Sequence, residues 1–153
     1  MKRICIPKGF SLVELLIVIA LTAVIAAIAI PQFQTSATNS ALREAARGVV
    51  ADISGTRQRA VEENVNAYRL TFNLTGNNYA LSNNDTGVTL WTKSFDDFKR
   101  GVRIDSIDSP VVSFQSRGTV TPTGTLVLRN GRASSATVTF NINGRAYVQF
   151  NMQ

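Results

Sequence analysis

The hydrophobic pattern changes its period twice along the chain, and its first part is an unbroken apolar run. Residues 10–30 read FSLVELLIVIALTAVIAAIAI, and their only charge is Glu14. As a helix, these residues span about 31 Å, which matches the roughly 30 Å hydrocarbon core of a bilayer. A core helix of a soluble protein shows a polar stripe every three or four residues, and this run shows none. The pattern predicts a transmembrane helix over residues 10–30.

Helical spacing returns after Pro31, now with a single apolar face. The positions on that face are Leu42, Ala46, Val49, Ile53, Thr56 and Ala60. Their alternating spacings of four and three predict a helix that packs this face against strands. Asn64 and Asn66 are poor residues for a helix interior, so we expect the helix to end near them. Gly48 and Gly55 lie inside the pattern, and their spacing suggests a close approach to the sheet.

From Tyr68 onward the period becomes two, which is typical of half-buried strands. Strands are expected near residues 68–74, 79–81, 88–92, 102–107, 111–115, 126–128, 138–142 and 146–150. Asn143-Gly144 predicts a two-residue hairpin turn, and residues 116–124 predict a loop. The fold class expected is α+β, with a long N-terminal helix packed on an antiparallel β-sheet.

Composition excludes most catalytic and metal chemistry. The chain has no histidine, so it lacks the commonest general base and metal ligand. Cys5 is the only cysteine, which rules out an intramolecular disulfide and a structural zinc site. Asp96, Asp97, Asp105 and Asp108 match no EF-hand spacing, and turn aspartates are common. We therefore expect neither an enzyme nor a cofactor.

The charges flanking the apolar run predict its orientation. The formal net charge is +6, and Lys2, Arg3 and Lys8 supply half of it. No charge follows Glu14 until Arg43. The positive-inside rule therefore places the N-terminus in the cytoplasm and sends the rest of the chain across the membrane.

Three interpretations of the apolar run compete. A cleaved signal peptide would use Ala27-Ile28-Ala29 as its cleavage site, but the run is longer than an ordinary signal core. A plain membrane anchor is the second interpretation. Both leave Glu14 unexplained, although a carboxylate within a transmembrane helix is costly and normally has a function.

The third interpretation comes from the residues at the start of the run. Lys8-Gly9-Phe10-Ser11-Leu12-Val13-Glu14-Leu15-Leu16 closely resembles the processing site of type IV prepilins and type II secretion pseudopilins. The resemblance implies cleavage between Gly9 and Phe10 by a prepilin peptidase, followed by N-methylation of Phe10. It divides the chain into a leader (1–9), a transmembrane assembly helix (10–30) and a periplasmic α+β pilin-like domain (31–153).

The resemblance also assigns roles to single residues and implies partners. Glu14 would neutralise the new amine of a neighbouring subunit during filament assembly, and Pro31 would mark a helix kink. The partners implied are other pilin or pseudopilin subunits and an inner-membrane assembly platform with its ATPase. The chain is then a single-pass protein of the inner membrane that enters a pseudopilus or pilus.

Within that family, the exported domain is most similar to the GspH/FimT type of minor pseudopilin and minor pilin. The residues that carry this likeness are the segment 57–64, the strand that follows it, and the terminal hairpin at Asn143-Gly144-Arg145. The resemblance leaves two roles open, in a type II secretion pseudopilus or in a type IV pilus.

A role in DNA uptake is the alternative. Some FimT-like minor pilins bind DNA through a C-terminal Gly-Arg-x-Arg motif, and here Tyr147 replaces the second arginine. Arg145 and Tyr147 would share one strand face, with Arg129 and Arg132 flanking another turn. Such side chains could bind phosphates and stack on a base.

Overall fold

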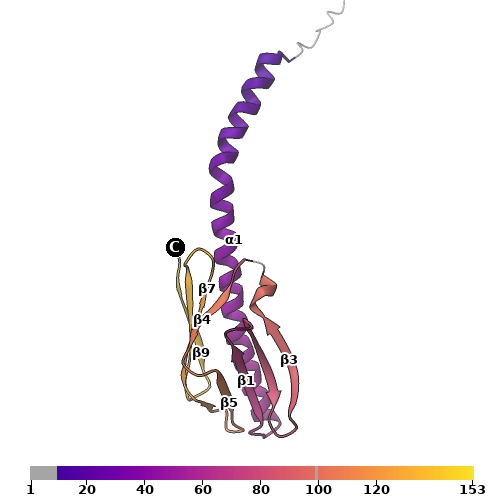
Figure 1. The fold of residues 1–153 in the computed structure, drawn as a ribbon, viewed down its shortest axis with the longest axis vertical. Coiled ribbons are helices and arrows are strands. Elements are labelled where there is room, and N and C mark those ends of the chain that lie inside the picture. The colour runs from indigo at the N-terminus through magenta and orange to yellow at the C-terminus, as the bar shows by residue number, and fades with distance from the viewer. Residues whose placement is uncertain (1–9, 99) are drawn as a thin grey trace, which may run out of the picture. The chain divides into compact units, whose positions relative to one another are not determined.

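The computed structural model describes residues 10–98 and 100–153. The predicted leader, with Gly9, lies outside the described residues. The chain divides into two compact units between Ser36 and Ala37, and each is described by itself. Figure 1 gives the element labels used below.

One long helix, α1, runs from Leu12 to Glu62 and continues through Pro31. Its end is set by Asn64, whose positive φ of 53° turns the chain out of the helix. The Val65 amide donates to the Ala60 carbonyl at 3.0 Å and the Asn64 amide to Val61 at 3.2 Å. This is the Schellman pattern that satisfies carbonyls at a helix end. The expected end of the helix near Asn64 is confirmed.

The strands form two antiparallel sheets. The first has the order β3-β2-β1-β5-β6 and the second the order β4-β7-β8-β9. The first sheet contains β1 (Tyr68–Asn73), β2 (Asn78–Asn83), β3 (Val88–Ser94), β5 (Val111–Phe114) and β6 (Val120–Thr121). The second contains β4 (Arg103–Ile107), β7 (Gly124–Arg129), β8 (Ser135–Phe140) and β9 (Ala146–Asn151).

The α+β class is confirmed, but the strands form two sheets where the sequence predicted one. The chain leaves the first sheet after β3, enters the second at β4, and returns with β5 to pair β1. Alternation along a strand reports which side chains are buried and not which strand is the neighbour, so the sequence pattern missed this crossing. A 3-10 helix, η1 (Phe95–Phe98), and the short β6 also escaped prediction.

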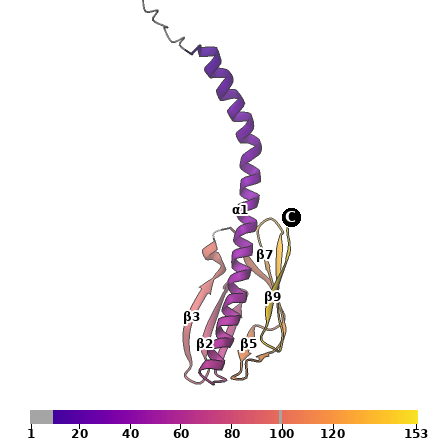
Figure 2. The ribbon, with the colours of Figure 1, turned by 180° about the vertical axis from the view of Figure 1, so that it is seen from behind.

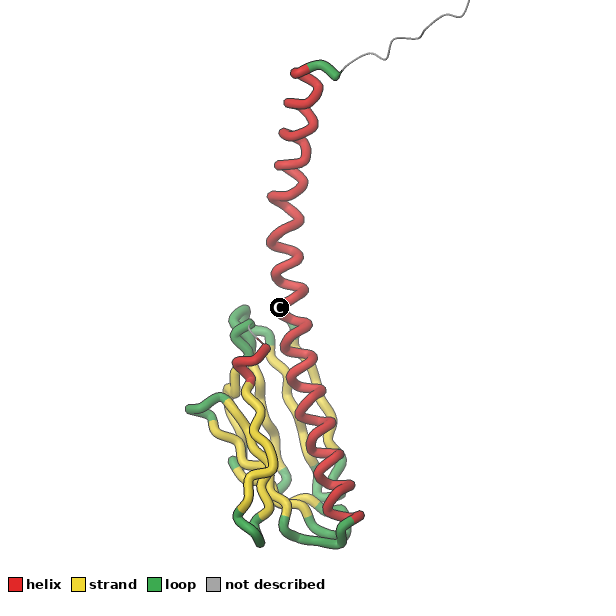
Figure 3. The backbone as a smooth tube through the Cα atoms, turned by 90° about the vertical axis from the view of Figure 1, so that its right-hand side faces the viewer, coloured by secondary structure: helices red, strands yellow, loops and turns green. Residues whose placement is uncertain are grey.

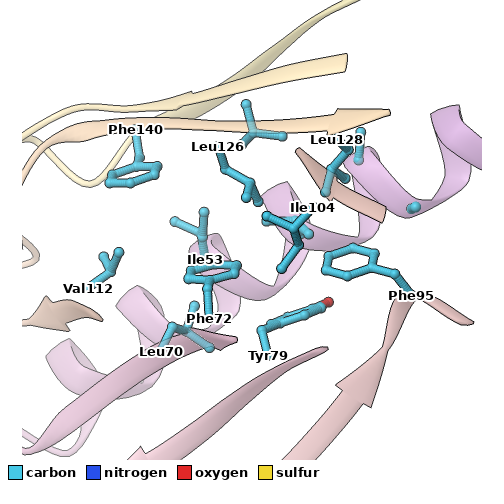
Figure 4. Close-up of a cluster of buried hydrophobic side chains, with 14 of the residues drawn as sticks. Ile53, Leu70, Phe72, Tyr79, Phe95, Ile104, Val112, Leu126, Leu128 and Phe140 are labelled. Atoms are coloured by element: carbon cyan, nitrogen blue, oxygen red, sulfur yellow. The ribbon is translucent and has the colours of Figure 1, made fainter. Parts of the chain in front are cut away.

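The core lies between the two sheets and the second half of α1. All six positions of the predicted helix face are buried. Figure 2 shows this part of α1 in front of the sheets, with β2 and β3 on one side and β7 and β9 on the other. Ile53 of α1 lies among side chains of both sheets, including Phe72, Leu126 and Phe140 (Figure 4). The helix is therefore the third wall of one hydrophobic core.

The β5–β6, β7–β8 and β8–β9 hairpins share one turn geometry, a three-residue loop. In the β8–β9 turn, the Asn141 amide donates to the Arg145 carbonyl at 3.0 Å and the Gly144 amide to Asn141 at 2.8 Å. The loop is therefore Ile142-Asn143-Gly144, with Gly144 at a φ of 68°. A three-residue loop of this kind places its left-handed residue third. The prediction of a two-residue turn at Asn143-Gly144 is wrong, because the glycine supplies the left-handed position of a longer loop.

Candidate functional site

The apolar segment at the start of α1 is exposed along its whole length. Its most apolar 18-residue window has a mean hydropathy of 2.8, and none of that window is buried. Phe10 is 83% exposed and Ile28 72% exposed. By length and composition this is the one helix in the described part of the chain that could cross a membrane. An exposed apolar rod of this size is stable only in lipid or against other proteins.

The first turn of the helix is capped by Ser11. The Leu15 amide donates to the Ser11 carbonyl at 3.2 Å, and the Val13 amide donates to the Ser11 hydroxyl oxygen at 3.3 Å. Ser11 is therefore the N-cap and Glu14 the third helical residue, the spacing of a capping box. The spacing Ser-x-x-Glu is visible in the sequence, although it did not enter the predictions above.

The position of Glu14 has an electrostatic consequence. The N-terminal end of a helix carries a partial positive charge from its unsatisfied amides, which favours an acidic side chain there. A free amine on Phe10 would add a full positive charge to the same turn. The role of Glu14 in assembly stays a prediction.

The helix α1 continues through Pro31, and the residues on both sides of Pro31 are exposed. Proline has no amide hydrogen, so one carbonyl of the preceding turn loses its helical partner. The Pro31 carbonyl accepts a hydrogen bond from the Thr35 hydroxyl at 3.0 Å. A kink at Pro31 stays a prediction.

The four residues suggested for DNA contact do not form one cluster. Arg129 and Arg132 belong to the β7–β8 turn, whereas Arg145 precedes β9 and Tyr147 lies within it. The six residues of β8 separate the two turns by about 17–20 Å. Tyr147 is 47% exposed. DNA contact through Arg145 and Tyr147 alone stays a prediction.

The β8–β9 turn instead lies against a different arginine. The Arg57 Nε, on α1, donates to the Gly118 carbonyl of the β5–β6 turn at 2.8 Å. A Cβ built on Gly144 would lie 2.6 Å from that same carbonyl oxygen. Arg57 therefore joins two hairpin turns to the helix. No sequence signal distinguished Arg57 from the other charged residues of α1.

Three of the four aspartates considered for calcium, Asp96, Asp105 and Asp108, have separate structural partners. Asp96 Oδ1 accepts from the Asn77 Nδ2 at 2.6 Å, and Asp105 pairs with Arg129 at 3.2 Å. Asp108 accepts from the amide and the hydroxyl of Thr125 at 2.8 and 2.9 Å. Among the described residues, no three metal-ligating side chains come together.

Two polar networks fasten α1 to the first sheet. Asp52 accepts from Lys93 Nζ at 2.7 Å and from the Tyr79 hydroxyl at 2.6 Å, and burial raises the pKa of Tyr79, with the Asp52 bond acting in the same direction. At the helix end, Glu63 accepts from the Tyr68 hydroxyl and from Arg59 Nε. These two bonds lower the pKa of Glu63, and the bond to Glu63 raises the pKa of Tyr68 and of Arg59.

The N-terminal residues match a known sequence motif. Residues 7–30 match the model of the prokaryotic N-terminal methylation motif. The match contains Gly9, Phe10 and Glu14 and ends where the apolar run ends. No curated protein matches the chain. The predicted resemblance of the processing site is confirmed at the level of this motif.

Two solved structures share the fold. The first is the minor pseudopilin EpsH from the type 2 secretion system of Vibrio cholerae, with a TM-score of 0.58 and 14% identity over 71% of this chain and 96% of that one. The second is the type IV minor pilin FimU of Pseudomonas aeruginosa PAO1, with a TM-score of 0.59 and 15% identity over 72% of this chain and 90% of that one. The predicted pilin fold is confirmed.

Proposed function

We propose that the chain is a minor pilin or minor pseudopilin, a structural subunit of a type IV pilus or of a type II secretion pseudopilus. The observation that carries this proposal is one chain joining a methylation motif at residues 7–30 to the fold of two minor subunits. The motif explains the apolar helix, and the fold explains the domain after it. Neither feature requires catalysis or a cofactor.

Maturation follows from the same residues. A prepilin peptidase would cut between Gly9 and Phe10 and leave the apolar helix on the mature protein, with a methylated amine on Phe10. The helix would then hold the subunit in the inner membrane, with the N-terminus at the cytoplasmic side and the domain in the periplasm. Mass spectrometry of the native protein tests this step: the expected first residue is a methylated Phe10. A mature chain beginning at Ile30 would identify a signal peptide instead.

Assembly would use Glu14. Leaving one member of a buried charge pair alone is strongly destabilising, whereas the pair itself is tolerated when its geometry is good. A subunit in lipid carries Glu14 without an external partner, and a neighbouring Phe10 amine in a filament would provide one. The carboxylate therefore favours the assembled state over the membrane-inserted state.

The experiment is incorporation of Glu14→Ala into filaments of the native host. We expect normal membrane insertion and processing and a strong loss of the subunit from sheared filaments. Glu62→Ala is the matched control, because it removes an exposed acid from the other end of the same helix. Normal incorporation of Glu14→Ala would remove Glu14 from the mechanism.

A further inference from the structure

Four arginines from two separate segments gather at one end of the domain. Arg129 and Arg132 belong to the β7–β8 hairpin. Arg100 lies just before β4, and Arg103 is the first residue of β4. The segments touch through their glycines, because a Cβ on Gly101 would lie 3.6 Å from the Gly131 amide nitrogen. Arg103 and Arg129 are direct partners in the β4–β7 ladder. We call these four residues the arginine end.

The charges of the arginine end are incompletely balanced. Arg129 pairs with Asp105 at 3.2 Å, yet its Nε is buried and has no hydrogen-bond partner. Arg100, Arg103 and Arg132 are exposed, and within the described residues none of them forms an ion pair. Like charges directly opposite in a ladder destabilise it. An external anion beside Arg103 and Arg129 would relieve that repulsion.

The arginine end borders a recess that can receive an anionic group. A cleft of about 810 Å³ is lined by residues of three segments, including Arg103, Arg129 and Gly131. Asp96 also lines it, but the Asn77 side chain already binds this carboxylate at 2.6 Å. Asn77 further donates to the Val102 carbonyl and accepts from the Ile104 amide, so one wall of the cleft is fixed.

The arginine end is tied to the part of α1 that follows the apolar run most closely. Asn130, 2% exposed, donates to the Asn39 side chain at 3.0 Å and to the Thr38 carbonyl at 3.5 Å. Thr38 comes only eight residues after Ile30 along the chain. Figure 3 shows the loops of this end of the domain beside α1.

We propose that the arginine end binds anionic phospholipid headgroups at the membrane that anchors the unassembled subunit. The inference rests on the membrane anchoring proposed above. Charge and the tether favour this partner: Asn130 binds Thr38 and Asn39, so the arginine end lies at the point of the domain that is eight residues along the chain from the apolar run. The nearest dense source of phosphate is then the bilayer surface. Because the helix already tethers the domain, weak binding suffices to hold it down.

The experiment reconstitutes the full chain in vesicles of neutral phosphatidylcholine or with phosphatidylglycerol added. Trp91 is the single tryptophan and serves as energy donor to a dansyl-labelled lipid headgroup. We expect transfer to be higher in the anionic vesicles and to fall as salt is raised. Each basic residue near an anionic surface shifts the bound-to-free ratio about fivefold, so Arg100→Gln, Arg103→Gln and Arg132→Gln together should reduce it by about 100-fold.

The matched control removes the same charge elsewhere. Arg69→Gln, Arg117→Gln and Arg145→Gln together leave the arginine end intact, and the control variant should keep the lipid response. Equal transfer in both vesicles, or equal loss in both variants, would overturn the inference. Resistance to carbonate extraction separates the two proposals. A chain that resists extraction but shows no lipid response refutes only lipid binding by the arginine end. A chain that is extracted refutes the membrane anchor and, with it, the inference.

Discussion

At the scale of single residues, Tyr79 shows how one polar group is held in the core. Its ring stacks on Phe72 and Phe95 at centroid distances of 5.4 and 5.2 Å and meets Trp91 edge-on at 5.7 Å. Its hydroxyl reaches Asp52 on α1 at 2.6 Å. The aromatic body thus contributes buried area and the hydroxyl fixes the helix to the sheet.

The buried phenol predicts a pH dependence of stability. The pKa of Tyr79 is higher in the folded chain than in the unfolded chain, mainly because of burial. The unfolded chain therefore loses this proton first as the pH rises past about 10, and the stabilisation present below that pH is lost above it. Tyr79→Phe should reduce the alkaline slope of the unfolding free energy by about 1.4 kcal/mol per pH unit. Urea unfolding of the full chain in detergent, followed by Trp91 fluorescence, measures it.

The same variant also has a cost at neutral pH, since it removes a hydrogen bond to a carboxylate. We expect a loss of about 1.5–3 kcal/mol there. Tyr147→Phe is the control, because that side chain is 47% exposed, and its profile should follow the parent. A parent-like alkaline slope in Tyr79→Phe would assign the pH dependence to other groups, of which Tyr68 is the first to test.

Single polar residues were the part of the structure that sequence pattern could not predict. Asn77, Asn130 and Arg57 each bind backbone groups far away in the chain. Nothing local marks such a residue, because its role depends on which segments the topology brings near it. Glu14 was the exception, since a lone charge within an apolar run is visible in the sequence itself.

At the scale of elements, the spacing of apolar residues predicted the helix, most of the strands and the buried face of the helix. The buried face of α1 and the strands from β1 to β9, apart from β6, follow spacings that the chain displays. Pairing was not predictable in this way, which is why two sheets were expected as one. The idea that Gly48 and Gly55 approach the sheet was wrong: outside the local helix backbone, no atom lies within 4 Å of a Cβ built on either.

The hairpin turns give a prediction at this scale. Gly144 has a φ of 68°, a conformation that costs other residues about 1–2 kcal/mol. A side chain there would also meet the Gly118 carbonyl oxygen at 2.6 Å and the Arg57 side chain. Gly144→Ala should therefore lower the unfolding free energy by about 2–5 kcal/mol, the sum of backbone strain and overpacking.

Gly131→Ala is the matched control for that prediction. It lies in the equivalent hairpin at the other end of β8, has no positive φ, and has open space where the methyl would stand. Its urea midpoint in detergent should stay close to that of the parent. Equal midpoints for Gly144→Ala and the parent would show that the Arg57 side chain moves aside without loss of stability.

At the scale of the whole molecule, apolar residues serve two separate purposes. The buried apolar core begins at Ala41, whereas the large apolar side chains from Phe10 to Phe33 are exposed. The 44% of hydrophobic residues in the chain is therefore a sum over a core and an anchor. This division explains why the sequence revealed the anchor at once: a membrane helix is apolar all round, and a core helix only on one face.

The division predicts that the domain folds without its anchor. Every buried residue of α1 lies at or after Thr38, so a fragment from Gln32 to Gln153 keeps the complete core. We expect this fragment to be a monomer in buffer without detergent, with a cooperative urea transition whose midpoint lies close to that of the full chain in detergent. Sedimentation and Trp91 fluorescence measure the two properties. An aggregated fragment, or one without a transition, would show that the apolar segment contributes to the fold as well as to anchoring and assembly.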